Sequence, residues 1–136
     1  MLCQYLLDKI DPTTAFKYAC EYGQEEVVKL FLSLSDWENM DLNGHAGDGK
    51  TGFMLACENG HSEVVKALLN HKGTKLIDYN AQDNLGSTAF MYACQSGRKS
   101  IVHLILNYPG IDINAIDNKG RSGFILAYQN GHFDIF

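Results

Sequence analysis

One pattern in this sequence recurs four times in the same register. Each copy starts at a hydroxyl residue, and successive starts are 37, 37 and 34 residues apart: Thr14, Thr51, Thr88 and Ser122. Counted from each start, Phe follows after two residues, Ala after five and Gly after nine, and Val or Ile follows four residues after each glycine. A fixed period of this length is typical of stacked structural units, so the sequence predicts an array of helical repeats.

The copy at residues 51–69 predicts two short helices joined by a tight turn. Thr51 is expected to cap the first helix, and Gly60 is expected to end it, because glycine adopts positive φ cheaply. Ser62 is expected to cap the second helix, whose apolar side chains from Val64 to Leu69 follow helical spacing. Both helices are shorter than an isolated helix that persists in water, so each unit must stack on a similar one.

Between the helical units lie segments that predict turns. Residues 83–86 (Asp-Asn-Leu-Gly) and 117–120 (Asp-Asn-Lys-Gly) carry Asp at the first position and Gly at the fourth, as type I turns prefer. The segments before them, 76–80 and 111–114, are extended in character. Each junction is therefore expected to form a small hairpin finger that projects from the helix pairs.

The complete pattern is Asn-Ala-x-Asp-x-x-Gly-x-Thr, then an apolar helix, Gly-His and Glu-Val-Val-Lys-x-Leu-Leu. It resembles the ankyrin repeat over roughly residues 11–136. The resemblance implies an all-α repeat solenoid, with stacked helix-turn-helix repeats of the ankyrin type joined by short β-hairpin fingers. The family's Thr-Pro-Leu-His start lacks its histidine here, and Gly52 and Gly123 replace its proline in two units. Glycine there is expected to weaken each helix start by up to about 1 kcal/mol.

A single domain of residues 1–136 is expected, divided at the repeat starts. Its parts are an N-terminal cap or partial repeat (1–12), repeat 1 (13–49), repeat 2 (50–86), repeat 3 (87–120) and partial repeat 4 (121–136). The last unit reaches Phe136 without the polar cap that arrays normally need. Two hypotheses follow: a fragment of a longer array, or self-association through the uncapped C-terminal end. A monomer mass that does not change with concentration would contradict the second.

Composition and cysteine spacing argue against a nucleic-acid-binding protein, a membrane protein and a disulfide-bonded protein. The net charge of -5 argues against a nucleic-acid backbone as the partner, and no apolar run is long enough for membrane insertion. Cys20, Cys57 and Cys94 are 37 residues apart, so they occupy one position in successive repeats. Stacked helices lie roughly 8–10 Å apart, whereas a disulfide needs α-carbons closer than about 7 Å. Free, buried thiols are expected, which suits an intracellular, cytoplasmic protein.

No pattern in the sequence predicts catalysis, a cofactor or a metal site. The spacing Gly-x-x-x-x-Gly-Lys-Thr of a phosphate-binding loop does occur at residues 44–51. Such a loop needs a buried strand before it, however, and the segment at residues 40–43 is too short and too polar to be one. The sequence therefore predicts a protein that is not an enzyme, with nucleotide binding kept only as an alternative.

What the resemblance implies instead is a protein-interaction module that binds another protein. In such arrays the fingers and first helices form a concave surface whose variable side chains contact the partner. The matching positions are Glu21, Tyr22, Asp48, Lys50, Glu58, Asn59, Asn84, Leu85, Ser87, Gln95, Ser96, Asn118, Lys119, Arg121, Gln129 and Asn130. Tyr22 and Leu85 are the expected apolar anchors, while Lys119 and Arg121 are expected to meet carboxylates. The alternative is an architectural spacer in a longer array.

Two further features carry expectations. Trp37, in a connecting segment, is a candidate anchor for a partner, although an aromatic residue there more often packs over the helix ends. By the resemblance to ankyrin repeats, Asn43, Asn80 and Asn114 match the asparagine that can be hydroxylated before the finger. An unshifted peptide mass after exposure to such a hydroxylase would contradict this hypothesis.

Overall fold

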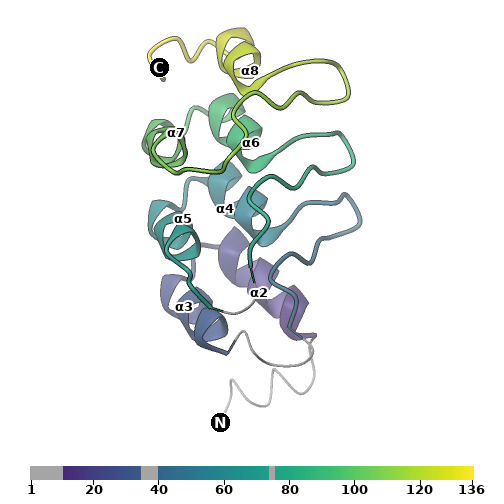
Figure 1. Cartoon of the computed structure of the whole chain (residues 1–136), viewed down its shortest axis with the longest axis vertical. Helices are drawn as coiled ribbons and strands as arrows, with labels where there is room; N and C mark the ends of the chain where they lie inside the picture. The colour runs from purple at the N-terminus through teal and green to yellow at the C-terminus, as the bar shows by residue number, and fades with distance from the viewer. Residues whose placement is uncertain (1–10, 35–39, 74–75) are drawn as a thin grey trace.

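The computed structural model describes residues 11–34, 40–73 and 76–136, and within those ranges it contains seven helices. In chain order they are α2 (Pro12–Glu21), α3 (Glu25–Ser33), α4 (Gly52–Asn59), α5 (Ser62–Leu69), α6 (Ala89–Gln95), α7 (Lys99–Leu106) and α8 (Gly123–Gln129). Figure 1 shows them in two columns, with α2, α4, α6 and α8 in one and α3, α5 and α7 in the other. Three loops project sideways from the first column. The predicted array of helix pairs is confirmed, whereas Trp37 and residues 1–10 lie outside the described ranges.

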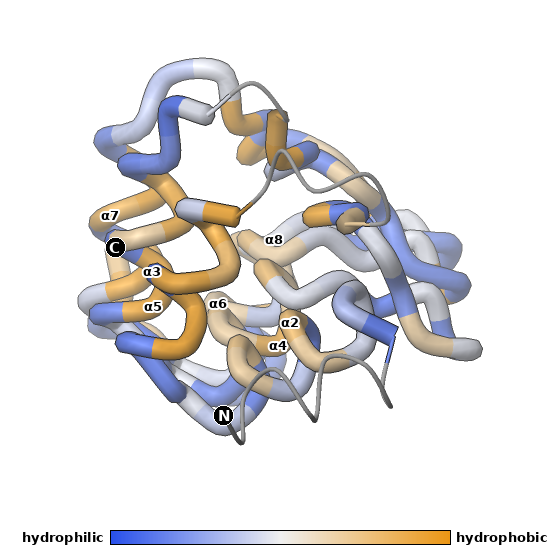
Figure 2. Tube along the Cα trace, turned by 90° about the horizontal axis from the view of Figure 1, so that it is seen from below, coloured by the Kyte–Doolittle hydropathy of each residue, from blue (hydrophilic) through white to orange (hydrophobic). Residues whose placement is uncertain are grey.

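The core is a continuous apolar layer between the two columns. Contacts join α2, α4 and α6 to the second helix of the same unit, and they join equivalent helices of successive units along both columns. Seen along the stack in Figure 2, apolar residues gather where the columns face each other, and polar residues dominate the projecting loops. The largest fully buried side chains include Phe16, Phe90, Met54, Leu68, Ile101 and Ile105. No unit encloses a core alone, so neighbouring units stabilise one another.

The first helices begin largely as the sequence predicts. Thr51 Oγ accepts a hydrogen bond from Met54 N at 3.3 Å, and Thr88 and Ser122 cap their helices in the same way. The first unit differs, because α2 begins at Pro12 with Asp11 as its N-cap, and Thr14 lies inside the helix. The fixed φ of proline favours the first helical position, so the N-cap and the helix start both lie three residues earlier than the position of Thr14 predicts.

The start of α5 differs from the prediction. Ser62 was expected to be the N-cap of α5, but it is the first helical residue, and His61 occupies the cap position without a side-chain bond. The Ser62 hydroxyl instead pairs with the Ser100 hydroxyl of the next unit at 3.2 Å. Gly60 has a φ of 78°, as predicted, and this left-handed turn starts the second helix one residue earlier than expected.

Close packing explains the glycines that replace proline at two helix starts. A Cβ on Gly52 would lie 3.0 Å from Cys20 Sγ, and a Cβ on Gly123 would lie 2.7 Å from the Phe90 ring. Each glycine therefore lets a large ring or a sulfur atom of the preceding unit approach the helix.

Cys20, Cys57 and Cys94 are free and buried, as predicted. Burial raises the pKa of each of these thiols, and it raises the pKa of Cys94 to about 12.

Side chains of one unit also bond to the backbone of the unit before it. His61 Nε2 lies 2.8 Å from the carbonyl oxygen of Glu21 and, since a carbonyl only accepts, this nitrogen carries the proton. Equivalent side chains bond to equivalent carbonyls at the next two junctions, from Arg98 Nε to Glu58 O at 3.1 Å and from His132 Nε2 to Gln95 O at 3.1 Å. These bonds fix the spacing between successive units.

The projecting loops are the predicted fingers, formed by hydrogen-bonded turns rather than by strands in the described part of the chain. They are named here the first finger (residues 46–50), the second finger (83–87) and the third finger (117–121). In each, the fourth residue donates its N–H to the carbonyl of the first at 2.9 Å. The only bridge among the described residues joins His45 to Thr51 at the base of the first finger.

Candidate binding surface

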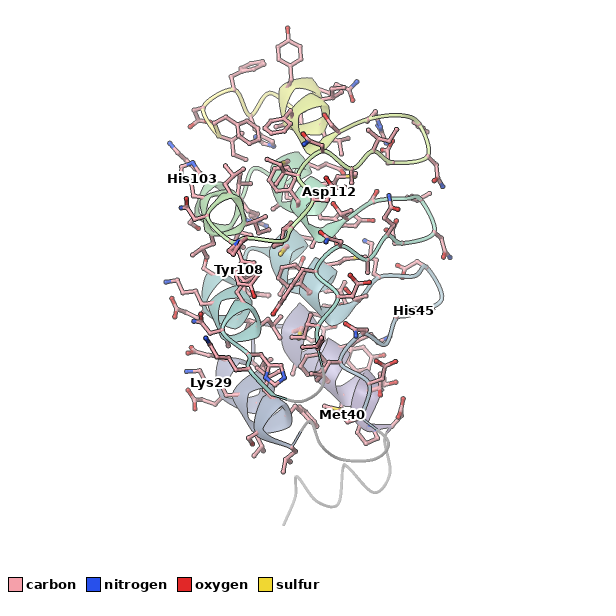
Figure 3. All side chains as sticks on the ribbon, viewed as in Figure 1. Lys29, Met40, His45, His103, Tyr108 and Asp112 are labelled. Carbon is pink, nitrogen blue, oxygen red and sulfur yellow. The ribbon has the colours of Figure 1, made fainter. Side chains whose placement is uncertain are left out.

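The fingers and the first helices together form one face of the molecule. In Figure 3, His45 lies on the side of the fingers, whereas Lys29 and His103 lie on the opposite side, on the second helices. Most positions predicted to contact a partner belong to the fingers or to the last turns of α2, α4, α6 and α8. The fold therefore brings residues far apart in sequence onto this face, here called the concave surface.

A groove of about 330 Å³ lies between α2, α4 and the first finger. Five of the predicted contact residues line it: Glu21, Asp48, Lys50, Glu58 and Asn59. The sequence interpretation missed its other lining residues: Lys17, Tyr18, Ala46 and Leu55. Lys17 and Tyr18 precede Glu21 by four and three residues. Helical spacing puts them on the same face as Glu21, and that signal could have found them.

Lys50 is held within this surface by two contacts. Its ammonium group lies 3.0 Å from a carboxylate oxygen of Glu58 and 4.7 Å from the centre of the Tyr92 ring. Its backbone N–H also donates to Asp48 Oδ1 at 3.0 Å. The positive charge of Lys50 is thus paired inside the protein, and its side chain joins the first finger to α4 and α6.

The second finger is organised by a buried carboxylate. Asp83 Oδ1 accepts hydrogen bonds from Leu85 N at 3.0 Å and Ser87 N at 2.9 Å, and the Tyr92 hydroxyl donates to Oδ2. Burial and this hydrogen bond raise the pKa of Tyr92. Ser87 is only 6% exposed and so offers almost no surface, in contrast to its predicted contact role. Leu85 is 67% exposed at the tip of the finger.

The third finger uses the same turn with a different partner. Asp117 Oδ1 accepts from Lys119 N and Arg121 N, both at 2.9 Å, and Arg121 Nε lies 2.9 Å from Oδ2. Burial alone would raise the pKa of Asp117, but these hydrogen bonds and the guanidinium charge outweigh it and lower the pKa. Arg121 is therefore already paired, which leaves Lys119 as the exposed cation of this finger.

Two predicted contact residues hold neighbouring fingers together. Asn84 donates from its backbone to Asp48 O at 3.0 Å and from its side chain to Gly47 O at 2.9 Å. Asn118 repeats the arrangement one unit later, with bonds to Leu85 O at 3.0 Å and Asn84 O at 3.1 Å. Their amide groups thus build the surface, and only their exposed edges remain available to a partner.

The remaining predicted positions lie at the ends of the first helices. Tyr22 is 67% exposed and stacks on Tyr18, with ring centres 6.4 Å apart. Asn59 Nδ2 donates to Glu21 O at 3.3 Å, and Asn130 Nδ2 donates to Leu126 O at 2.8 Å. Gln95, Ser96 and Gln129 are exposed or half-buried.

The segment that matches a phosphate-binding loop has a different structure. Residues 44–51 form the first finger and its base, and no strand precedes them in the described residues. Thr51 Oγ is used as a helix cap, and the Lys50 ammonium pairs with Glu58. The two side chains that would hold phosphate and magnesium are therefore occupied, which removes the support for nucleotide binding.

Asn43 and Asn80, two of the three asparagines proposed for hydroxylation, bond to the backbone of the following unit. Asn43 Nδ2 donates to Leu76 O at 2.9 Å, and its Oδ1 accepts from Asp78 N at 2.6 Å. Asn80 makes the equivalent bonds to Gly110 O and Asp112 N at 2.9 and 2.7 Å. Hydroxylation at these positions and at Asn114 stays a prediction.

The described residues contain neither a cluster of metal-binding side chains nor a membrane-spanning helix. Among residues 11–34, 40–73 and 76–136, no group of three or more His, Cys, Asp or Glu side chains could hold a metal ion. Within the same ranges, no helix has the length and apolar character needed to cross a membrane.

Comparison with known proteins agrees with this geometry. No curated protein sequence matches the chain significantly. A family model of ankyrin repeats, which represents three copies of the repeat, matches residues 18–117 and also residues 74–136. The two matches overlap and together cover most of the chain, including six of the seven described helices in full. The chain belongs to the ankyrin repeat family.

Proposed function

We propose that this chain is a protein-interaction module that binds a partner protein through the concave surface. Ankyrin repeats generally mediate protein–protein interaction and are typically not enzymes. The observation that carries the proposal is the groove between α2, α4 and the first finger, which gathers side chains from three separate segments. Concave sites of this kind, with a few convergent polar groups, are where proteins usually bind their ligands.

Exposed side chains along the same surface support the proposal. Tyr22 and Leu85 are both 67% exposed, at the end of α2 and at the tip of the second finger. Lys119 is an exposed cation at the tip of the third finger. Tyrosine is among the residues that most often dominate the binding energy at protein interfaces, and an exposed leucine adds apolar area to the contact.

The test needs variants that change the exposed side chains without disturbing the fingers. Arg121 pairs with the buried Asp117, so reversing its charge would disturb the finger itself. The surface variant therefore carries Tyr22→Ala, Leu85→Arg and Lys119→Glu. The matched control carries the same kinds of change on the second helices, Leu30→Ala, Leu106→Arg and Lys99→Glu, all at exposed positions.

Each protein is first verified as folded by circular dichroism and then used as bait in a lysate of the source cells, with mass spectrometry of the captured proteins. The expected result is a protein retained by the unchanged chain and by the control, and reduced at least tenfold on the surface variant. A tenfold loss corresponds to about 1.4 kcal/mol of binding free energy. Identical captures by all three baits would contradict the proposal and favour the spacer function.

The proposed partner is a protein rather than a nucleic acid. The net charge of -5 disfavours binding to a phosphate backbone. Ankyrin repeat proteins are commonly intracellular, and the three cysteines of the described residues are free, so we place the proposed interaction in the cytoplasm. Fractionation that found the protein only in a secreted pool would contradict this location.

A further inference from the structure

We propose that the groove between α2, α4 and the first finger holds an arginine side chain of the bound protein. The inference rests on the proposed function and deepens it, because it assigns a chemical class to the part of the partner that enters the groove. It is carried by the charges, hydrogen-bond acceptors and apolar contacts that line the groove.

The charges of the groove leave room for one additional cation. Its lining carries three carboxylates, from Glu21, Asp48 and Glu58, and two ammonium groups, from Lys17 and Lys50. Lys50 and Glu58 neutralise each other at 3.0 Å. Neither Glu21, Asp48 nor Lys17 forms an ion pair with any other described residue. The groove thus carries one net negative charge, which a single positive side chain would balance.

The polar atoms at the rim are mainly acceptors. The carboxylate of Glu21 has no hydrogen-bond partner among the described residues, and Asp48 uses one oxygen for the N–H of Lys50 and keeps the other free. Asn59 donates its Nδ2 hydrogen to Glu21 O, which leaves Oδ1 as an acceptor. A guanidinium group has five N–H donors and no acceptor, so its chemistry complements this rim.

The apolar side chains that line the groove favour arginine over lysine. Tyr18, which is 53% exposed, and Leu55 and Ala46 provide apolar area along the groove. The guanidinium plane stacks on aromatic rings and bonds carboxylates in pairs, whereas an ammonium group acts as a compact point charge. A volume of about 330 Å³ lies at the small end of ligand sites, which suits one side chain better than a folded element.

The experiment titrates the ¹⁵N-labelled full chain with N-acetyl-arginine amide and follows backbone amide shifts by NMR. N-acetyl-citrulline amide, which has nearly the same shape without the charge, is the matched probe. Arginine is expected to cause saturable shifts in the millimolar range at residues 17–22, 46–50 and 58–59, and citrulline is expected to cause none. The shifts should weaken with added salt, because the contacts are partly exposed.

Variants separate the groove from the general acidity of the protein. Glu21→Gln with Asp48→Asn is expected to bind arginine about tenfold more weakly, since each change removes a charged hydrogen-bond acceptor. Glu26→Gln with Asp134→Asn removes the same charge at exposed positions away from the groove and is expected to leave binding unchanged.

Three results would overturn the proposal: no saturable shifts with arginine, equal shifts with citrulline, or shifts that lie outside the groove. None of these results concerns the capture experiment, in which the surface variant keeps every residue that lines the groove. A partner captured through the concave surface together with an arginine-insensitive groove would sustain the proposed function and remove this inference.

Discussion

The second and third fingers have the same turn but different surroundings. Both begin with Asp-Asn, place Gly fourth and bond the fourth N–H to the first carbonyl at 2.9 Å. The second finger is bonded on both sides, to the first finger through Asn84 and to the third through Asn118. Among the described residues, the third finger is bonded to another finger on one side only.

The difference shows that one sequence signature has two separate effects. Within its own unit, the signature forms the turn, and this effect is equal in both fingers. Between units, the same residues contact the neighbouring finger, and this effect depends on position in the array. Asp83 and Asp117 add a further difference, because one pairs with a tyrosine and the other with an arginine. Equivalent substitutions are therefore expected to have unequal costs.

The largest difference is expected between Gly86→Ala and Gly120→Ala. Both glycines have a positive φ, of 78° and 74°, so alanine costs about 1–2 kcal/mol of left-handed strain at either position. At Gly86 the new Cβ would also lie 2.8 Å from Asn118 N, whereas nothing lies within 4 Å of a Cβ at Gly120. Overpacking of this kind adds about 1–3 kcal/mol.

Urea unfolding of the two variants measures this difference. Gly86→Ala should lower the free energy of unfolding by about 2–5 kcal/mol, and Gly120→Ala by about 1–2 kcal/mol. Equal losses would show that the contact between the fingers relaxes without cost. That result would remove the distinction drawn between the effect within a unit and the effect between units.

A smaller difference is expected between the two aspartate partners. Tyr92→Phe removes the hydroxyl that donates to Asp83 but keeps the ring under the Lys50 ammonium, so it isolates one hydrogen bond to a buried carboxylate. Such bonds contribute about 1.5–3 kcal/mol. Arg121→Met removes a guanidinium that is 36% exposed from a carboxylate, Asp117, that is buried. Asp117 keeps its hydrogen bonds from the backbone of Lys119 and Arg121, and water reaches the guanidinium side of the pair, so the expected loss is about 1 kcal/mol.

Chemical denaturation at pH 7 compares the stabilities of these two variants. A larger loss for Arg121→Met than for Tyr92→Phe would reverse the expected order. It would show that the ion pair at the third finger is better shielded from water than its exposure indicates.

The smallest effect is expected in the pH dependence of the third finger. Asp117 has a lowered pKa in the folded chain, so its stabilising contribution is complete above the unfolded value of about 3.9 and is lost as pH falls through the folded value. Asp117→Asn is less stable at pH 7, but it should lose less stability than the unchanged chain between about pH 5 and pH 2.5. Urea midpoints measured across this range test the effect.

Asp134→Asn, at an exposed position, is the control for the loss of one carboxylate. Its midpoints should follow those of the unchanged chain. Parallel curves for Asp117→Asn and the unchanged chain would contradict the lowered pKa as a source of acid sensitivity.

The sequence predicted the elements that depend on local chemistry and strict periodicity. Thr51 as a cap, Gly60 with positive φ and buried Cys57 follow from propensity and register, and the structure confirms each of them. It did not predict that α2 begins at Pro12, because the register of the other units placed its start at Thr14. From the sequence, Gly52 and Gly123 predict only a local weakening of the helix starts, because their packing role depends on side chains of another unit.

The candidate surface was predictable in outline but not in detail. Positions on the fingers and first helices followed from the family pattern, and five of them line the groove. Burial of Ser87 and pairing of Arg121 depend on the turn around each aspartate, which spacing alone does not reveal. Tyr18 and Lys17 lie one turn before the end of α2, whereas the family pattern marks only the residues at the helix end.

The bonds between units, described above for His61 and Arg98, bear on how such a chain changes length during evolution. Each bond runs from a side chain after the repeat glycine to a backbone carbonyl, and every residue has that carbonyl whatever its side chain. A duplication or deletion of one whole unit would therefore bring together two surfaces that already fit. Recombination at the repeat boundary can lengthen or shorten the array without new compensating mutations at the join.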